Sequence, residues 1–248
     1  MPPERIRGLP QQHGVGDFNK TARIAGLLYL ITVVTGLFGL MYVPSQISVP
    51  GNPSATIANI VASQSLYRFG IAAALVCYTV FLVVPLPLYR LLSPVGRNAA
   101  ALMVVFAVVN VPLALLSIAK KLDILSVLDR AGRGPAIPSD QVQAQAQVMH
   151  SLDAYGNGML IGQIFAGLWL IPFGYLVFNS GFLPRVLGVL LMAGGFGYLI
   201  TVFGHVLIPD YDHLPIANFD TLPAGLGEIG ICLWLLIVGV KEPSSITR

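Results

Sequence analysis

The stretch NAAALMVVFAVVNVPLALLSIA, from Asn98 to Ala119, contains no charged side chain. A helix crosses the hydrocarbon core of a bilayer with about 20 predominantly apolar residues, because each residue advances it by about 1.5 Å. Such a stretch must be helical in lipid, since every backbone N–H and C=O then needs a partner within the chain. The stretch therefore predicts a membrane-spanning helix.

Five further windows of the same kind lie on either side of it, and none carries Lys or Arg through its middle. The six predicted spans are 22–43, 67–91, 98–119, 154–178, 184–208 and 221–240. The chain is 55% hydrophobic and 10% charged, whereas soluble proteins carry about 25% charged residues. We expect an all-α fold, a polytopic membrane bundle of six transmembrane helices. It forms one domain over residues 22–240, with tails at 1–21 and 241–248.

The distribution of Lys and Arg predicts the orientation of this bundle. With six spans, nine of these residues fall on the side of the termini: Arg5, Arg7, Lys20, Arg23, Arg90, Arg97, Arg185, Lys241 and Arg248. Five fall on the other side: Arg68, Lys120, Lys121, Arg130 and Arg133. We expect a protein of the inner (plasma) membrane with both termini in the cytoplasm. No signal-peptide cleavage site follows Val43, so we expect the first span to be retained.

Two connections between spans predict short interfacial helices. Asn52 and Pro53 form a good helix start, which predicts a helix over 54–65. In the third connection, the breaker cluster 132–138 is followed by Ser139 as a cap. Four apolar residues then recur at helical spacing: Val142, Ala146, Met149 and Leu152.

Small residues and prolines inside the spans predict how the helices pack. Gly158 and Gly162 on one helix, and Gly36 and Gly39 on another, are typical of close helix contacts. Four prolines lie inside spans and predict kinks or cavity walls: Pro85, Pro87, Pro112 and Pro172. Both cysteines, Cys77 and Cys232, fall inside spans, and we expect buried thiols.

Polar groups inside the spans are the best pointers to function, because a charge at the bilayer centre costs on the order of 3 kcal/mol. Glu228 is the carboxylate that lies clearly inside a span. Tyr198, Thr201 and His205 share one face of the fifth span at helical spacing. We expect a polar pocket in the half of the bundle remote from the termini. Its expected ligand-binding residues are Arg68, Asn110, Asp153, Asn157, Tyr198, Thr201, His205 and Glu228.

Three functions remain open for this pocket. The leading one is the binding or movement of a hydrophobic or amphipathic small molecule. The second is an intramembrane isomerase, cyclase or hydrolase acting on a lipid or isoprenoid, with Glu228 as general acid and His205 or Asp153 as its base. The third is a structural or accessory subunit, in which the polar groups pair as Arg–Glu and Lys–Asp ties.

Other chemistry finds little support in the sequence. His205, Asp210, Asp212 and His213 offer metal ligands, but their spacing matches no known site, so no metal is expected. Residues 225–230 match GxGxxG by letter, yet no strand precedes them, so no cofactor is expected. The expected partners are membrane lipids. Nucleic acid is excluded, because the basic residues flank spans and form no patch interleaved with aromatics.

Several short stretches carry a family resemblance that covers most of the chain. They are Thr21–Leu30 (TARIAGLLYL), Gly51–Pro53 with Ala58–Ile60, Tyr67–Gly70 (YRFG), Gly174–Ser180 (GYLVFNS), Phe182–Gly188 (FLPRVLG), and Glu228 with Leu233–Leu236 (LWLL). With these stretches the sequence resembles the DUF4386 family of bacterial multi-spanning membrane proteins. The resemblance implies a multi-spanning architecture and leaves the activity open.

Overall fold

The computed structural model describes residues 15–131 and 138–240. Most of the predicted N-terminal tail, the C-terminal tail and nearly all of the breaker cluster lie outside these described residues. Every regular element in the described part is a helix. In chain order they are α1 (Val15–Gly36), η1 (Leu37–Tyr42), α2 (Val43–Ile47), α3 (Pro53–Ala62), α4 (Gln64–Phe81), α5 (Pro85–Leu92), α6 (Arg97–Ala131), α7 (Pro138–Asn179), α8 (Arg185–Leu207), η2 (Tyr211–His213), η3 (Pro215–Asn218), α9 (Leu222–Leu233) and η4 (Trp234–Val238).

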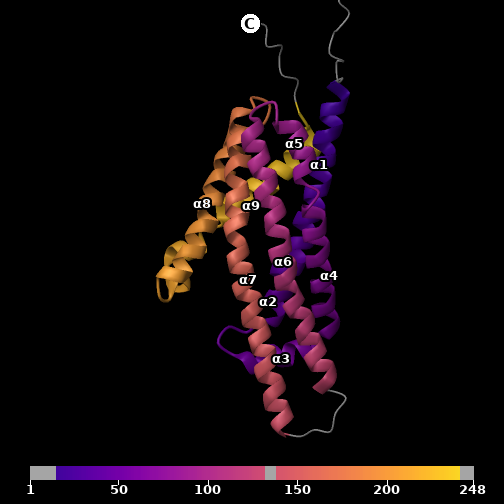
Figure 1. Ribbon diagram of the computed structural model, residues 1–248, viewed down its shortest axis with the longest axis vertical. Helices are drawn as coiled ribbons and strands as arrows, with labels where there is room; N and C mark the ends of the chain where they lie inside the picture. Colours follow the sequence, from indigo (N-terminus) through magenta and orange to yellow (C-terminus); the bar gives the residue numbers. More distant parts are fainter. Residues whose placement is uncertain (1–14, 132–137, 241–248) are drawn as a thin grey trace, which may run out of the picture.

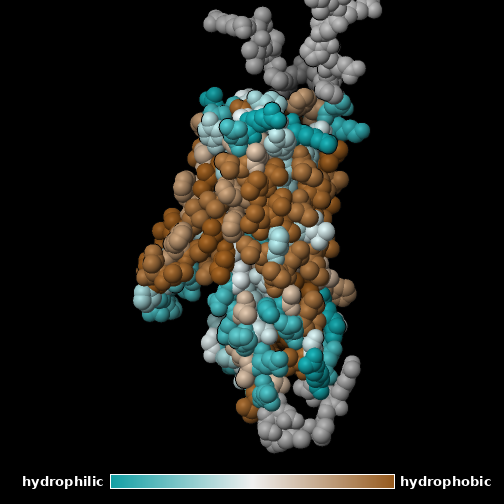
Figure 2. Space-filling view, viewed as in Figure 1, coloured by the Kyte–Doolittle hydropathy of each residue, from teal (hydrophilic) through white to brown (hydrophobic). Residues whose placement is uncertain are grey.

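The prediction of six spans in an all-α bundle is confirmed. The helices long and apolar enough to cross a membrane cover Asp17–Ile47, Gln64–Leu92, Arg97–Arg130, Val142–Asn179, Arg185–Leu207 and Pro215–Val238. The first described residues and the last lie at the same end of the bundle (Figure 1), as an even number of crossings requires. We call this end the terminal end and the opposite one the distal end. A broad hydrophobic belt covers the bundle between more hydrophilic ends (Figure 2).

The third connection differs from the prediction. The expected helix does form, but it is the first part of the 42-residue α7 rather than a separate interfacial helix. The preceding α6 has 35 residues. At about 1.5 Å per residue these helices are about 52 and 63 Å long, well beyond the roughly 30 Å of a hydrocarbon core. The predicted apolar stripe is buried only in part, because Leu152 packs against buried residues while Val142 is exposed.

The first connection agrees with the prediction. The side chain of Asn52 accepts a hydrogen bond of 3.0 Å from the backbone N–H of Ala55, which caps α3. Pro85 interrupts the second span, where α4 ends and α5 begins after a short turn. Pro112 and Pro172 lie inside α6 and α7, which the structure assigns as continuous helices.

The helices that cross the membrane form a closed ring. In order around it, α1 packs on α4, α4 on α6, α6 on α7, α7 on α8, α8 on α9, and α9 on α1. The α1–α9 contact lies toward the terminal end. Farther along, η1 packs mainly on α4, and α8 leans away from the bundle axis toward the distal end (Figure 1). The first span and α9 therefore separate toward the distal end.

Glycines let two neighbouring helices of this ring approach closely. A Cβ added at Gly195 of α8 would lie 2.8 Å from the carbonyl oxygen of Gly167 in α7. Two turns farther along α7, a Cβ added at Gly174 would lie 2.6 Å from the carbonyl oxygen of Gly188 in α8. The predicted close contacts also occur, since Cβ atoms at Gly158 and Gly39 would meet atoms of α6 and α4.

Candidate functional site

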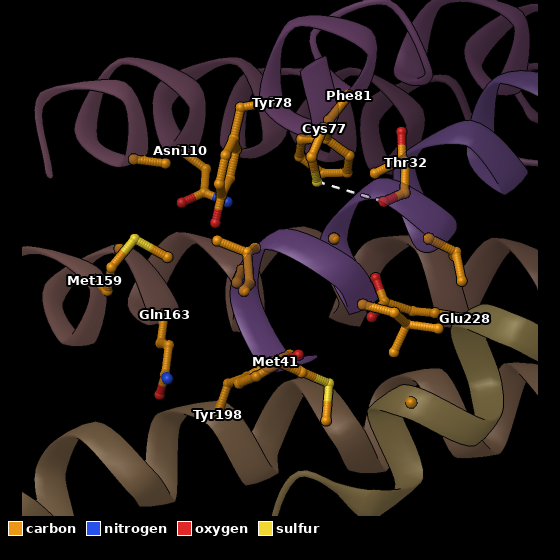
Figure 3. Close-up of a pocket in the computed structure, with 18 of the residues that line it drawn as sticks. Thr32, Met41, Cys77, Tyr78, Phe81, Asn110, Met159, Gln163, Tyr198 and Glu228 are labelled. Carbon is orange, nitrogen blue, oxygen red and sulfur yellow. Dashed lines mark hydrogen bonds between the residues drawn. The ribbon is translucent and has the colours of Figure 1, made fainter. Parts of the chain in front are cut away.

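A cavity of about 490 Å³ lies inside the ring of helices (Figure 3). Six transmembrane elements and η1 contribute to its wall, which is mostly apolar. The polar side chains in the wall are those of Tyr29, Thr32, Cys77, Tyr78, Asn110, Tyr155, Gln163, Tyr198 and Glu228. Its volume falls in the range of roughly 300–1,000 Å³ that is usual for small-molecule sites.

Among the described residues that line this wall, Glu228 is the one with a carboxylate. It belongs to α9, and its Oε1 accepts a hydrogen bond of 2.8 Å from the hydroxyl of Tyr29 in α1. Its position follows from glycines on the neighbouring helices, because Gly194 lets α9 approach α8 at Ala224. Among the residues that the structure describes, no Lys, Arg or His forms an ion pair with Glu228.

Aromatic rings build the part of the wall next to this carboxylate. The ring of Trp169 lies 5.0 Å from that of Phe81, edge to face, and 5.1 Å from that of Phe173, stacked. It also lies 6.1 Å from the ring of Tyr29. Trp169, Tyr29 and Phe173 are almost fully buried. The hydroxyl that binds Glu228 is thus held in place by a packed aromatic cluster.

Two amides add polar groups elsewhere in the wall. Asn110 of α6 is buried. The Oε1 atom of Gln163 in α7 is buried too and has no hydrogen-bond partner among the described residues. Like the second oxygen of Glu228, it is an acceptor in the wall that receives no hydrogen bond from the described residues. Buried acceptors are usually satisfied, so these two oxygens could each accept a hydrogen bond from a bound molecule.

The structure brings together only some of the residues that the sequence suggested. Glu228, Tyr198 and Asn110 line the cavity. The others lie outside its wall, so the single polar pocket expected in the distal half is not formed as one site. Arg68 pairs with Asp129 at 3.5 Å on the surface. Asp153 and Asn157 are exposed on α7, and Thr201 and His205 belong to a different network.

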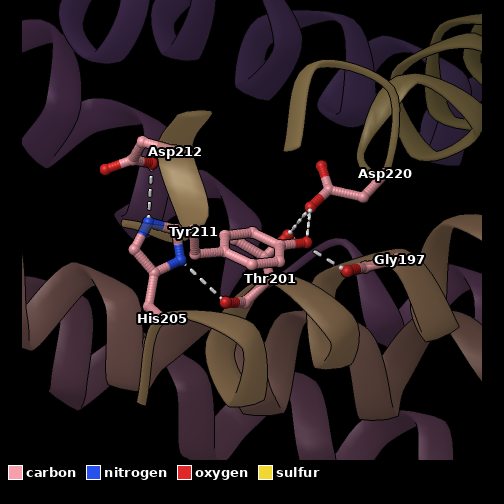
Figure 4. A network of polar contacts seen from close by, with 6 residues as sticks. All are labelled: Gly197, Thr201, His205, Tyr211, Asp212 and Asp220. Carbon is pink, nitrogen blue, oxygen red and sulfur yellow. Dashed lines mark hydrogen bonds and ion pairs between the residues drawn. The ribbon is translucent and has the colours of Figure 1, made fainter. Parts of the chain in front are cut away.

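That network ties α8 to the segment that leads into α9 (Figure 4). The carboxylate of Asp220 accepts hydrogen bonds from Thr201 Oγ1 at 2.6 Å and from the hydroxyl of Tyr211 at 2.9 Å. His205 Nε2 lies 2.9 Å from Asp212 Oδ1, and its Nδ1 lies 2.7 Å from the carbonyl oxygen of Thr201. The contacts join the last turns of α8 to this connection, which indicates a structural role.

The weak metal candidate in the same connection is not assembled. Of its four side chains, only those of His205 and Asp212 form an ion pair or hydrogen bond with each other. Asp210 is in the left-handed region, with φ at 57°, as the turn after α8 requires. Within 15–131 and 138–240, no group of three or more His, Cys, Asp or Glu side chains could hold a metal ion.

Removing one hydrogen bond from this network should destabilise the fold. Tyr211→Phe deletes a bond to a carboxylate and leaves Asp220 with one donor fewer, which we expect to lower the free energy of unfolding by about 1.5–3 kcal/mol. Denaturant unfolding of the detergent-solubilised protein measures this change. The control is Tyr175→Phe, because Tyr175 is exposed and its hydroxyl makes no hydrogen bond with the described residues. Equal stability of the two variants would contradict a structural role for the network.

Several cavity residues were missed by the sequence analysis. Tyr29, Trp169 and Gln163 are examples. Gln163 carried a usable signal, since it is an uncharged polar residue near the middle of the predicted span 154–178. Tyr155, Met159 and Gln163 also follow one another at four-residue spacing, which places them on one face of α7.

Comparisons with known proteins agree with the architecture. A sequence profile described as "Domain of unknown function (DUF4386)" matches residues 24–239. A protein of Archaeoglobus fulgidus described as "Uncharacterized protein" is 26% identical over 164 residues, which are 64% of this chain and 76% of the relative. No solved structure matches the chain. Because the profile runs from the first span to the last, the chain belongs to the DUF4386 family.

Proposed function

We propose that this protein binds a membrane-soluble amphiphile in the central cavity, with an ammonium or hydroxyl head group that donates a hydrogen bond to Glu228. One observation carries the proposal. A carboxylate lines an apolar cavity of about 490 Å³ inside the membrane spans, and among the described residues it has one hydrogen-bond donor, Tyr29, and no cation. We also propose, from the distribution of Lys and Arg, that the termini face the cytoplasm across the inner membrane.

The energetics of Glu228 favour a ligand over a structural tie. An ionised carboxylate in an apolar environment costs several kcal/mol unless it is paired and hydrogen-bonded. The structural alternative needs an Arg–Glu pair, but Arg68 contacts Asp129 instead. Tyr29 donates a hydrogen bond to one oxygen of the carboxylate, and a donor on the ligand would bind the other oxygen.

The exposed part of the wall supports a route from the bilayer. The side chains at the edge of the cavity that are open to the surroundings are apolar: Leu37 and Met41 from η1 and Ile229 from α9. Met41 is 65% exposed. Gly225 lies at the same edge, and a Cβ added there would meet no atom within 4 Å. The ligand would therefore pass between η1 and α9, directly from lipid.

The enzyme alternative has weaker support. A general acid at Glu228 needs a base across the substrate, and the two suggested bases, His205 and Asp153, lie outside the cavity wall. Tyr78 and Tyr198 are hydroxyl groups, which are poor bases near neutral pH because their usual pKa is about 10. Binding requires no catalytic base in the cavity wall, so we place binding ahead of catalysis.

Filling the edge between η1 and α9 tests the proposal. The probe is a dodecylamine brominated along its chain, which should quench the fluorescence of Trp169 in bilayer nanodiscs. The background is Trp234→Phe, because Trp169 is then the remaining tryptophan. Gly225→Phe should slow the onset of quenching after mixing by about tenfold or more, since the ring occupies the route and a barrier higher by about 1.4 kcal/mol slows a step tenfold. Gly156→Phe is the control, because Gly156 also has open space but lies outside the cavity wall. An unchanged rate of quenching in Gly225→Phe would rule out this route.

A further inference from the structure

A second, smaller pocket lies toward the distal end of the bundle and has a volume of about 240 Å³. Its wall comes from α2, the segment after it, α3, the start of α4, α6 and α7. The residues that matter here are Ser48, Thr56, Tyr67, Lys121 and Tyr155. Tyr155 also lines the central cavity, so the two spaces share one ring as a wall.

Lys121 is the most unusual residue of this second pocket. It is 5% exposed, yet among the described residues it forms neither an ion pair nor a hydrogen bond. Its Nζ lies 4.1 Å from the centroid of the Tyr155 ring, which provides a cation–π contact. Two carboxylates of α6 pair with other cations, since Asp123 pairs with Lys120 and Asp129 pairs with Arg68. A buried ammonium without a carboxylate is costly.

A second donor in the pocket also lacks a partner. Tyr67 is 5% exposed, and its hydroxyl is buried without a hydrogen bond to any described residue. The hydroxyl of Thr56 is already engaged, because it accepts from the backbone N–H of Val49 at 2.9 Å. Two independent donors, one of them positively charged, therefore face a pocket whose described wall contains no carboxylate. The central cavity differs, because its wall holds the carboxylate of Glu228 and no Lys or Arg among the described residues.

We infer that the pocket around Lys121 and Tyr67 binds a phosphate group. Lys binds phosphate as a point charge, and the Tyr hydroxyl supplies a directed hydrogen bond to a second oxygen. The pocket lies where the uncharged run 98–119 of α6 has just ended, at the level expected for lipid head groups. The phosphate can belong to a lipid head group or be free in solution, and the two sources can be separated by experiment.

The test uses the full chain purified in dodecyl maltoside, which contains no phosphate. Native mass spectrometry measures the binding of phosphatidylglycerol and of the diacylglycerol with the same acyl chains. Calorimetric titration at constant ionic strength measures the binding of inorganic phosphate. Lys121→Met should weaken phosphatidylglycerol binding about tenfold or more, because hydrogen bonds to charged groups are worth about one to two powers of ten in affinity. Diacylglycerol should bind equally weakly to both proteins.

Two further variants make the result specific. Lys120→Met removes the adjacent, exposed and ion-paired lysine and should leave binding unchanged. Tyr67→Phe removes only the hydroxyl and should weaken binding severalfold. Lys121→Met should fold at least as well as the natural protein, since it replaces a buried unpaired charge by an apolar chain of similar length.

The outcomes distinguish a lipid head group from free phosphate. Loss of phosphatidylglycerol binding in Lys121→Met, without binding of inorganic phosphate to the natural protein, supports a lipid head group. Loss of both supports a site for phosphate from either source. The inference is overturned if folded Lys121→Met binds both probes as the natural protein does, or if the natural protein binds neither. Because Glu228 plays no part in these measurements, their failure would leave the function proposed for the central cavity untouched.

Discussion

Glu228→Gln should raise the half-quenching concentration of brominated dodecylamine at Trp169 by about tenfold or more. The substitution keeps the size of the side chain, and Tyr29 can still donate to the amide oxygen. It removes the negative charge that would bind the ammonium group, and a hydrogen bond to a charged group is worth about 1.5–3 kcal/mol. That energy corresponds to roughly one to two powers of ten in the dissociation constant.

Two comparisons decide how this result is interpreted. Asp153→Asn makes the same chemical change at an exposed site outside the cavity wall and should leave the affinity unchanged. Brominated dodecanol, which donates a hydrogen bond but carries no charge, should lose less affinity in Glu228→Gln than the amine does. If the amine binds Glu228→Gln as tightly as it binds the natural protein, the carboxylate does not bind the ligand and the proposed function is wrong.

The fold could be predicted from the sequence as far as hydropathy determines it. Six apolar runs of sufficient length require six helices, because lipid offers the backbone no other partner. The prediction for the third connection was wrong because the apolar run ends before Lys120, whereas the helix continues beyond it. Lys120, Lys121 and Leu122 are good helix formers, so α6 continues beyond the apolar run to Ala131.

The site could be predicted only in part, for reasons of tertiary packing. Glu228 was identifiable because a carboxylate inside a span is rare. Its partner was not, since Tyr29 is 199 residues away in the sequence and meets it only because α9 packs on α1. His205 and Thr201 share a helical face with Tyr198, as predicted. However, α8 leans away from the bundle toward its distal end (Figure 1), so their polar groups reach the connection to α9 instead of the cavity.

The second large effect is expected at the glycines between α7 and α8. Gly195→Ala places a Cβ 2.8 Å from the carbonyl oxygen of Gly167, and backbone atoms cannot move aside as a flexible side chain can. We expect a loss of about 1–3 kcal/mol in the free energy of unfolding, the usual cost of overpacking. Gly174→Ala should cost a similar amount, because its Cβ would lie 2.6 Å from the carbonyl oxygen of Gly188. Denaturant unfolding in detergent measures each change.

The double variant of Gly174 and Gly195 tests whether these contacts hold the two helices together. The two contacts lie about 10 Å apart along α7, at a distance where effects usually add, so the double variant should lose about 2–6 kcal/mol. Gly156→Ala is the matched control, because its Cβ meets open space and Ala favours a helix over Gly by up to about 1 kcal/mol. The same chemical change should thus stabilise at one site and destabilise at the other. If Gly195→Ala were as stable as Gly156→Ala, α7 and α8 would not be in close contact. Tyr198 of α8 could then no longer be placed opposite Gln163 of α7 in the wall of the cavity.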